Sequence, residues 1–207
     1  MESYALSHGY VSSPDDIDLS EFGLAYMTFN DSTFTDPLGG TTGDKSTNYN
    51  MTYSFANGGN DQYAFKTLSK WAGVMNQKSV PEASYPYQLD KEDTTYTFKA
   101  EYVSYILSGQ KYINMKERDL VKQAIIENGA VSTIYTTNQK RSDKYVYYSE
   151  PTGSGHEVTI VGWDDNIDKS LFASNGYETP PGNGAWLIKN SWGSSAGNNG
   201  YFWMSYY

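Results

Sequence analysis

Apolar side chains recur at helical spacing along much of the first part of the chain. This spacing predicts three helices, over residues 1–8, from residues 17–22 onward, and over residues 61–75. The first helix is expected to end where Gly9 and then Pro14 break the pattern. Asp18 or Ser20 is expected to cap the second, because short polar side chains accept hydrogen bonds from the free N–H groups of a helix start.

Two segments of this first part lack an apolar period. Residues 30–57 are rich in Gly, Thr, Asn and Asp, which is typical of a long ordered loop. Compact domains usually keep such loops for binding. Pro81 then interrupts the chain before the turn Tyr85-Pro86-Tyr87.

Further along, the pattern changes from a helical to an alternating period. Alternation predicts five strands, over residues 96–106, 130–135, 157–163, 184–189 and 201–206. One amphipathic helix is expected among them, over residues 115–128, and Gly129 stops it. The polar linker of residues 167–183, which carries Pro180-Pro181, is predicted to be an exposed loop.

Predicted helices dominate the first part of the chain and predicted strands the rest. Segregation of this kind indicates an α+β organisation in which two halves pack together. We therefore divide the chain into a helix-rich half, residues 1–88, and a strand-rich half, residues 89–207.

The composition supports a folded domain of this kind. The chain has 207 residues, of which 38% are hydrophobic, so it can bury a core and does not resemble a disordered protein. Its 20 tyrosines suit β-rich surfaces and clefts, because they cover large areas while keeping a polar tip in water. The content of Tyr, Asn, Ser and Gly is typical of extracellular bacterial proteins, so we expect a secreted or cell-surface location.

Charge narrows the range of partners. A net charge of −9 offers no basic face to replace counterions, which excludes nucleic acid as the partner. The same charge weakens docking on anionic membranes, and no apolar run is long enough to cross a bilayer. We therefore expect no membrane insertion.

The sequence contains no cysteine. Disulfides, thiolate metal sites, iron–sulfur clusters and thiol catalysis by these residues are therefore excluded. We expect neither a metal ion nor an organic cofactor.

The chain has two histidines, and their surroundings differ. His8 lies beside a turn and is expected to be a solvated surface residue. His156 follows a glycine-rich turn that brings the imidazole to the start of a buried strand. A histidine placed in this way is either a candidate general base or a structural residue whose polar atoms are satisfied by hydrogen bonds.

A second segment offers a partner for His156. The apolar run from Gly184 to Lys189 ends in Asn190, and Trp192 follows shortly after. A buried amide beside an indole is unfavourable unless it is hydrogen-bonded, and an imidazole N–H is a suitable partner. Such a bond would fix the orientation and tautomer of the ring, as the third member of a nucleophile–base–orienter site does.

Together these segments resemble the papain-like cysteine peptidases. Members of that family place the base histidine in His-x-Val-x-x-Val-Gly-Tyr/Trp, a form that residues 156–163 match. They place the orienting asparagine in Lys-Asn-Ser-Trp-Gly followed by Gly-x-x-Gly-Tyr, here residues 189–193 and 197–201. The three motifs occur in the order that the family has.

Weaker resemblances lie in the helix-rich half. Asn57-Gly58-Gly59, followed by a predicted helix, resembles the Asn-Gly-Gly of the family's substrate-binding wall. Leu19-Ser20-Glu21 and Tyr85-Pro86-Tyr87 resemble a helix start and a turn of the family. Ala56 stands where the family usually has a cysteine, so the corresponding disulfide cannot form.

The resemblance implies a role for each matching residue. His156 would be the general base and acid, Asn190 would orient it, and Trp192 would shield their hydrogen bond from water. A peptide or protein substrate would contact Asn57, Gly58, Gly59 and Gly155. Strand alternation directs Glu157 away from the cleft, so we expect no catalytic role for it.

The resemblance also implies a fold and a missing part. In the papain-like fold a helical N-terminal half packs against a β-barrel-like C-terminal half, with the active cleft between them. The family's nucleophilic cysteine opens a helix whose later turns Met1-Glu2-Ser3-Tyr4 resembles. We therefore expect the thiol to precede Met1 in a longer polypeptide, and these 207 residues alone to be inactive.

Three interpretations stay open at this point. The chain is part of a Cys–His–Asn peptidase, a non-catalytic papain-like domain that binds peptides or a protein, or one chain of an enzyme that another polypeptide completes. Retention of both His156 and Asn190 favours the first. A carbohydrate-binding β-module would explain the aromatic residues but not Lys-Asn-Ser-Trp-Gly. Apolar surface left open beside the missing helix would favour self-association.

Overall fold

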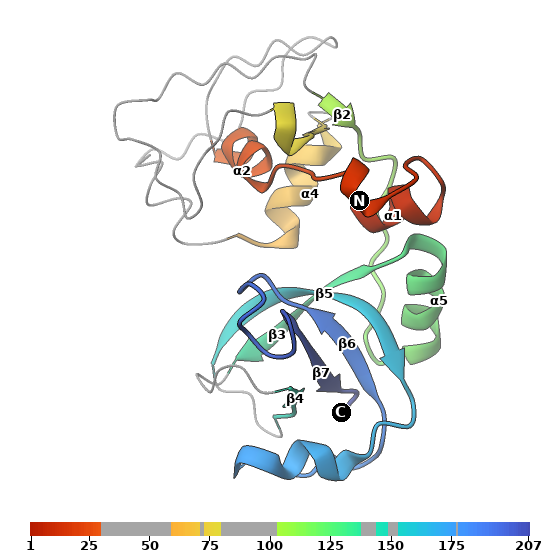
Figure 1. Ribbon diagram of the computed structural model, residues 1–207, viewed down its shortest axis with the longest axis vertical. Coiled ribbons are helices and arrows are strands. Elements are labelled where there is room, and N and C mark those ends of the chain that lie inside the picture. The colour runs from red at the N-terminus through yellow and green to blue at the C-terminus, as the bar shows by residue number, and fades with distance from the viewer. Residues whose placement is uncertain (30–58, 71–72, 80–102, 138–143, 149–152, 177) are drawn as a thin grey trace. The chain divides into compact units, whose positions relative to one another are not determined.

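The computed structural model of the protein describes residues 1–29, 59–70, 73–79, 103–137, 144–148, 153–176 and 178–207 (Figure 1). The chain forms two compact units. The sheet unit consists of residues 1, 3–10 and 113–207, and the helical unit of residues 2 and 11–112. The predicted boundary at residue 88 falls outside the described residues, so the division into halves at that point stays a prediction.

The helical unit contains the helices α2 (Glu21–Phe29) and α4 (Asp61–Ser69). The hydroxyl of Ser20 accepts a hydrogen bond from the N–H of Gly23 at 3.0 Å, so the predicted cap of the second helix is confirmed. Asn60 caps α4 in the same way, through an N–H of the first helical turn. Two short 3-10 helices complete the regular helical structure described here, η1 (Pro14–Asp16) and η2 (Gln77–Ser79).

The third predicted helix is shorter than expected. Residues 61–75 were predicted as one helix, but α4 ends at Ser69 and strand β1 (Val74–Met75) follows. Gly73, immediately before the strand, has a φ of 74°, a left-handed conformation that does not continue a helix. β1 pairs antiparallel with β2 (Val103–Tyr105), which confirms the later part of the predicted strand over residues 96–106.

Several predictions for this unit concern residues outside the described ranges. They are the long loop of residues 30–57, the turn at residues 85–87 and the first part of the strand at residues 96–102.

Two predicted helices are confirmed in the sheet unit, α1 (Glu2–Ser7) and α5 (Arg118–Asn128). α5 ends at Gly129, whose φ of 82° is the left-handed conformation that the sequence predicts for this glycine. A Cβ at Gly129 would lie 2.7 Å from the carbonyl oxygen of Ser3. The absence of a side chain therefore lets the first helix pass close to the end of α5.

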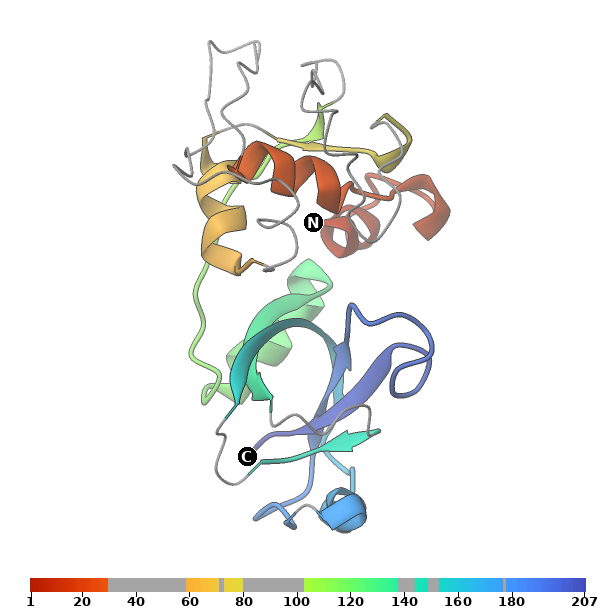
Figure 2. The ribbon, with the colours of Figure 1, turned by 90° about the vertical axis from the view of Figure 1, so that its left-hand side faces the viewer.

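One sheet of five strands dominates the sheet unit. The strands are β3 (Val131–Thr137), β4 (Tyr145–Val146), β5 (Ser154–Asp164), β6 (Ala185–Lys189) and β7 (Tyr201–Ser205). Their order is β3-β5-β6-β7-β4, and all neighbours are antiparallel except β7 and β4. Figure 2 shows how strongly the sheet curls, although among the described residues no pairing joins β3 to β4 into a closed barrel. The α+β class is confirmed, as are the four strands predicted beyond residue 129.

The core of the sheet unit combines side chains of α5 with side chains of the sheet. Val121 of α5, Ile160 of β5 and Ile188 of β6 have no exposed surface. Burial of an apolar side chain of this size contributes about 1.5–3 kcal/mol. The same cluster contains Ile125, Val146, Val158, Trp186 and Phe202. It packs β5 and β6 firmly together, and these are the strands that position His156 and Asn190.

Most of the described residues of the linker 167–183 are exposed, as predicted, but the linker is not a simple loop. Residues 169–176 form the 3-10 helix η4 (Lys169–Gly176). Its Phe172 has no exposed surface and contacts Tyr145 of β4 edge to face, with ring centroids 5.6 Å apart. Pro180 is also buried. The sequence did not reveal the helix or the buried ring, because one aromatic residue in a polar stretch produces no periodic pattern.

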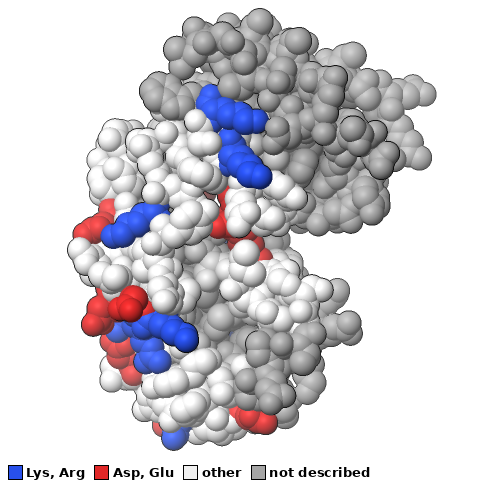
Figure 3. Space-filling view, turned by 180° about the vertical axis from the view of Figure 1, so that it is seen from behind, with Lys and Arg blue, Asp and Glu red and all other residues white. Residues whose placement is uncertain are grey.

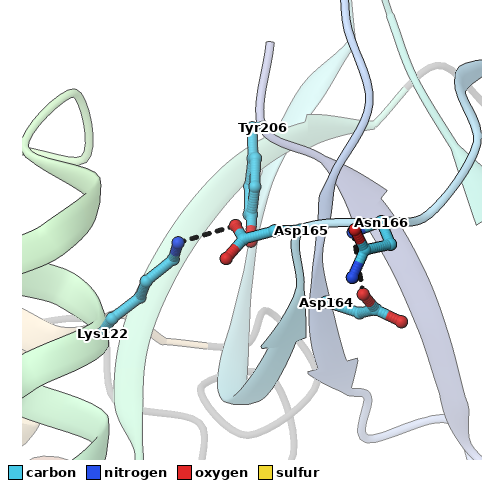
Figure 4. Close-up of polar contacts among 5 residues, drawn as sticks. All are labelled: Lys122, Asp164, Asp165, Asn166 and Tyr206. Atoms are coloured by element: carbon cyan, nitrogen blue, oxygen red, sulfur yellow. Dashed lines mark hydrogen bonds and ion pairs between the residues drawn. The ribbon is translucent and has the colours of Figure 1, made fainter.

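A polar cluster joins α5 to the segments that follow β5 and β7 (Figure 4). The Oδ1 atom of Asp165 accepts hydrogen bonds from Lys122 Nζ at 2.6 Å and from the Tyr206 hydroxyl at 2.9 Å. The hydrogen bond from Lys122, above all, lowers the pKa of Asp165. Because the Asp165 side chain is 56% exposed, its ion pair with Lys122 contributes at most about 1 kcal/mol.

Basic and acidic side chains are interspersed on the face shown in Figure 3. No extended basic patch is visible there among the described residues. The described residues of this face therefore offer a polyanion no continuous basic surface. Within the described ranges, no helix has the length and apolar character needed to cross a membrane.

We expect Phe172→Ala to lower the free energy of unfolding by about 3–5 kcal/mol, because it removes a fully buried ring. Lys169→Ala changes an exposed residue of the same short helix and should have an effect below about 0.5 kcal/mol. Urea unfolding of both variants measures the difference. Equally small effects would contradict the buried position of Phe172.

Candidate active site

His156 and Asn190 come together at the ends of two neighbouring strands. His156 lies near the start of β5, and Asn190 directly follows β6, which pairs antiparallel with β5. Their side chains meet with His156 Nε2 at 2.8 Å from Asn190 Oδ1. The backbone N–H of Asn190 donates to the carbonyl oxygen of Gly200 at 2.9 Å, which holds the amide at the end of its strand. The pairing that the sequence predicts for these two residues is therefore present.

A third hydrogen bond determines which end of the Asn190 amide is the oxygen, and thereby which nitrogen of His156 carries the proton. The backbone N–H of Ser191 donates to Asn190 Oδ1 at 2.8 Å. A backbone N–H requires an acceptor, so the side-chain oxygen, and not the NH₂ group, occupies this position. The same oxygen must then accept from His156 Nε2, which places the proton of the neutral imidazole on Nε2. Nδ1 keeps its lone pair and is the nitrogen that can accept a proton.

Trp192 covers one face of the imidazole. The two rings stack with centroids 4.7 Å apart and planes inclined by 20°. The indole is 43% exposed, so it lies between the His156 ring and solvent. An indole face in this position also attracts a positively charged imidazolium. Shielding of the His156–Asn190 hydrogen bond from water, the role that the resemblance implies for Trp192, stays a prediction.

The loop that carries Trp192 depends on residues in left-handed conformations. Gly197 has a φ of 59°, and a Cβ there would overlap the carbonyl oxygen of Tyr201. Gly200 has a φ of 87°, a conformation that favours glycine, and it supplies the carbonyl that binds Asn190. The glycines of the Gly-x-x-Gly-Tyr motif are therefore needed to return the chain to β7 beside the amide.

The other predicted site residues are distributed over both units. Gly155 directly precedes His156 on β5, is exposed, and has Ile134 as its nearest side chain. Gly59 is exposed in the helical unit, next to the Asn60 cap of α4. Asn57 and Gly58 lie outside the described residues. Contact of these four positions with a substrate stays a prediction.

Two residues without a predicted catalytic role agree with their expected surroundings. His8 is exposed, stacks on Tyr4 with centroids 3.9 Å apart, and contacts the Tyr4 carbonyl through Nδ1. Glu157 accepts a hydrogen bond from the Ser132 hydroxyl, and as the neighbour of His156 on β5 it faces the other side of the sheet.

Tyr135 is a contact of His156 that the sequence did not reveal. It lies directly opposite His156 in the pairing of β3 with β5. The two rings meet edge to face, with centroids 5.7 Å apart and planes at 70°. Burial, reinforced by the charge of Tyr148, raises the pKa of Tyr135 to about 12. The alternating pattern of β3 was visible in the sequence, but the register that brings Tyr135 to His156 was not.

The arrangement can accept a proton at Nδ1, stabilise the resulting imidazolium and later return the proton. The 207 residues supply no thiol to meet this nitrogen, because they include no cysteine. Among the described residues, no group of three or more His, Asp or Glu side chains is placed to hold a metal ion.

Comparison with known proteins places this site in context. The sequence model of a family described as "Papain family cysteine protease" matches residues 46–207. A cathepsin L-like peptidase of Aedes aegypti is 29% identical over 149 residues, which cover 72% of this chain and 40% of that protein. Digestive cysteine proteinase 3 of Homarus americanus is 32% identical over 130 residues, which cover 60% of this chain and 35% of that protein. The chain therefore spans less than half the length of these relatives.

Solved structures show the same fold. The cysteine protease and lectin-like domains of Cwp84, a surface layer associated protein of Clostridium difficile, match 99% of this chain and 41% of that chain, with 28% identity and a TM-score of 0.62. A digestive procathepsin L2 proteinase from Tenebrio molitor larval midgut matches 99% of this chain and 56% of that chain, with 20% identity and a TM-score of 0.57. At that identity the second likeness shows the fold alone.

Tyr135 makes the stability of the protein sensitive to alkaline pH. Its pKa is raised to about 12 in the folded protein, against 10.0 for an ordinary tyrosine, so the folded state holds the proton more tightly. The stabilisation is complete below about pH 10 and is lost as the pH rises towards about 12. We expect the free energy of unfolding to fall across this window, and Tyr135→Phe to remove part of the fall.

Urea unfolding at about pH 9 and about pH 11, on either side of the usual tyrosine pKa, measures this effect. Tyr112→Phe is the matched control, because its ring is 69% exposed and should leave the fall unchanged. Identical pH dependence of the Tyr135→Phe and unmodified proteins would contradict the expectation.

Proposed function

The chain belongs to the papain family of cysteine proteases, and we propose that it supplies the general base and the orienting amide of a Cys–His–Asn peptidase site. One observation carries the proposal: the 2.8 Å contact of His156 Nε2 with Asn190 Oδ1, in motifs that match the family. The thiol has to come from outside the 207 residues, since they contain no cysteine.

In the proposed reaction, Nδ1 of His156 takes the proton of the thiol and leaves a thiolate beside an imidazolium. The thiolate attacks the carbonyl carbon of the peptide bond, and the imidazolium gives its proton to the leaving amine. Water then hydrolyses the thioester with His156 again as the base, which releases the carboxylic acid and restores the thiol.

Asn190 and Trp192 act on the imidazole during these steps. Asn190 Oδ1 holds the Nε2 proton, so the ring stays oriented in both its neutral and its charged form. The stacked indole of Trp192 stabilises the imidazolium by about 0.5–1 kcal/mol, the range for a cation–π contact at a partly exposed site.

The substrate in this proposal is a peptide or protein. Gly155 supports such a substrate, because it is exposed beside His156 and has no side chain to obstruct an approaching backbone. Asn57, Gly58 and Gly59 are proposed to bind the same backbone by resemblance to the family. A secreted or cell-surface location is proposed too, since one relative is named a digestive proteinase and one solved neighbour a surface layer associated protein.

A second candidate function is binding without catalysis. The observation that favours it is the complete lack of cysteine in the chain. In this case the site would hold a peptide or a partner protein, and a second copy of the chain is one such partner. A related arrangement is a two-chain enzyme, in which another polypeptide brings the thiol to His156.

The 207-residue chain alone should not hydrolyse a fluorogenic peptide, because it has no nucleophile. A natural polypeptide that contains this chain and a cysteine should be active and should lose activity on alkylation of the thiol. In that polypeptide we expect His156→Ala to lower kcat by about 10²–10⁴-fold, the usual contribution of a general base. His8→Ala is the matched control and should leave kcat unchanged.

Intact mass and N-terminal sequence of the native protein from its source cells separate the candidates. A longer species that carries a cysteine supports the peptidase. A native species without one supports binding, or a thiol supplied in trans, and light scattering then tests for self-association. Hydrolysis by the rigorously purified chain of 207 residues would contradict the proposed mechanism.

A further inference from the structure

In the described part of the sheet unit, three side chains contact the imidazole of His156. Asn190 binds Nε2 from the end of β6, and Trp192 stacks on a ring face from the loop that follows. Tyr135 approaches from β3, as the residue directly opposite His156 in the sheet. The family motifs include the first two, whereas Tyr135 lies outside them.

Asn190 and Trp192 leave one motion of the imidazole open. A hydrogen bond at Nε2 still allows the ring of His156 to rotate about the line from Cβ to Nε2. This rotation keeps the bond to Asn190 but swings Nδ1, the nitrogen that has to meet the thiol. Trp192 limits the swing on its own side only, and it belongs to a loop and is 43% exposed.

The Tyr135 side chain is held in place beside His156 by its packing against the sheet. Its ring is half-buried and packs against the hydrophobic core, with Phe202 at a centroid distance of 5.8 Å. Its plane stands at 70° to the imidazole in an edge-to-face contact, which a rotation of the imidazole would disrupt. Burial raises its pKa to about 12, so the hydroxyl stays neutral at physiological pH and adds no charge beside His156.

We infer that Tyr135 is a positioning residue, which fixes the ring plane of His156 and thereby the direction in which Nδ1 points. The inference rests on the proposed function of His156 as the base. Its consequence for catalysis follows from geometry, because a general base works only when the accepting nitrogen lies within hydrogen-bond reach of the proton. The aromatic ring is the acting part of Tyr135, so phenylalanine should replace it.

Nuclear magnetic resonance of the 207-residue chain tests the inference without any need for activity. The protein has two histidines, so the ¹⁵N signals of His156 are assigned by comparison with exposed His8, which serves as an internal reference. In the unmodified chain, neutral His156 should carry one proton, on Nε2, and its ring should show a nuclear Overhauser effect to the Tyr135 ring.

Substitutions at residue 135 should distinguish an effect of the aromatic ring from an effect of general side-chain packing. Tyr135→Phe should keep the Nε2–H signal and the single tautomer of His156. Tyr135→Leu should keep the Nε2–H bond to Asn190 but free the ring plane, so that ¹³C relaxation of the His156 ring shows a rotation that the unmodified and Tyr135→Phe proteins lack. Phe172→Leu is the matched control, because it removes a buried ring that packs against Tyr145, and the His156 ring should show no additional rotation.

A folded Tyr135→Leu protein whose His156 ring shows no additional rotation would overturn the inference. If that variant does not fold, the unmodified chain decides: a Tyr135–His156 Overhauser effect supports the inference, and its absence overturns it. Asn190→Ala provides the independent check on the proposed function. An unchanged His156 tautomer in that variant would contradict the orienting role of Asn190 while leaving the test of Tyr135 intact.

Discussion

Asn190 Oδ1 accepts two hydrogen bonds at once, from the backbone of Ser191 and from the imidazole of His156, both at 2.8 Å. The first bond determines which end of the amide is the oxygen, and the second then determines which imidazole nitrogen carries the proton. Several features of the sheet unit hold this oxygen in position. The pairing of β5 with β6 brings the two side chains together, and the carbonyl of Gly200 holds the amide in place.

The sequence predicted those parts of the structure that depend on local pattern. α5 and the long strands follow from helical and alternating periods, and the joint occurrence of His156 and Asn190 in family motifs predicted their contact. Features that depend on a single residue were missed. Gly73 separates α4 from a strand where the apolar period continues, and Phe172 is buried without any periodic neighbours. Tyr135 was missed for a third reason, since strand register is not encoded in any local pattern.

His156 and Asn190 both belong to the sheet unit, whose hydrophobic core packs their strands together, and this has a consequence for a chain without a cysteine. Val158 of that core lies two residues after His156 on β5. Ile188 of the core lies on β6, two residues before Asn190. The geometry of the pair is thus maintained by the folding of the unit itself and requires no thiol. A polypeptide of this kind can present a prepared base to a nucleophile from elsewhere, or keep the same surface for binding alone.

Trp192 lies against His156 with its rings nearly parallel and 43% of its surface exposed. An imidazolium in contact with an indole accepts an electron from its excited state far more readily than a neutral imidazole does, so it quenches the fluorescence of that indole. The protein has five tryptophans, and this one is stacked on the proposed base. The fluorescence intensity of Trp192 is therefore expected to report the charge of the imidazole in the unlabelled protein in solution.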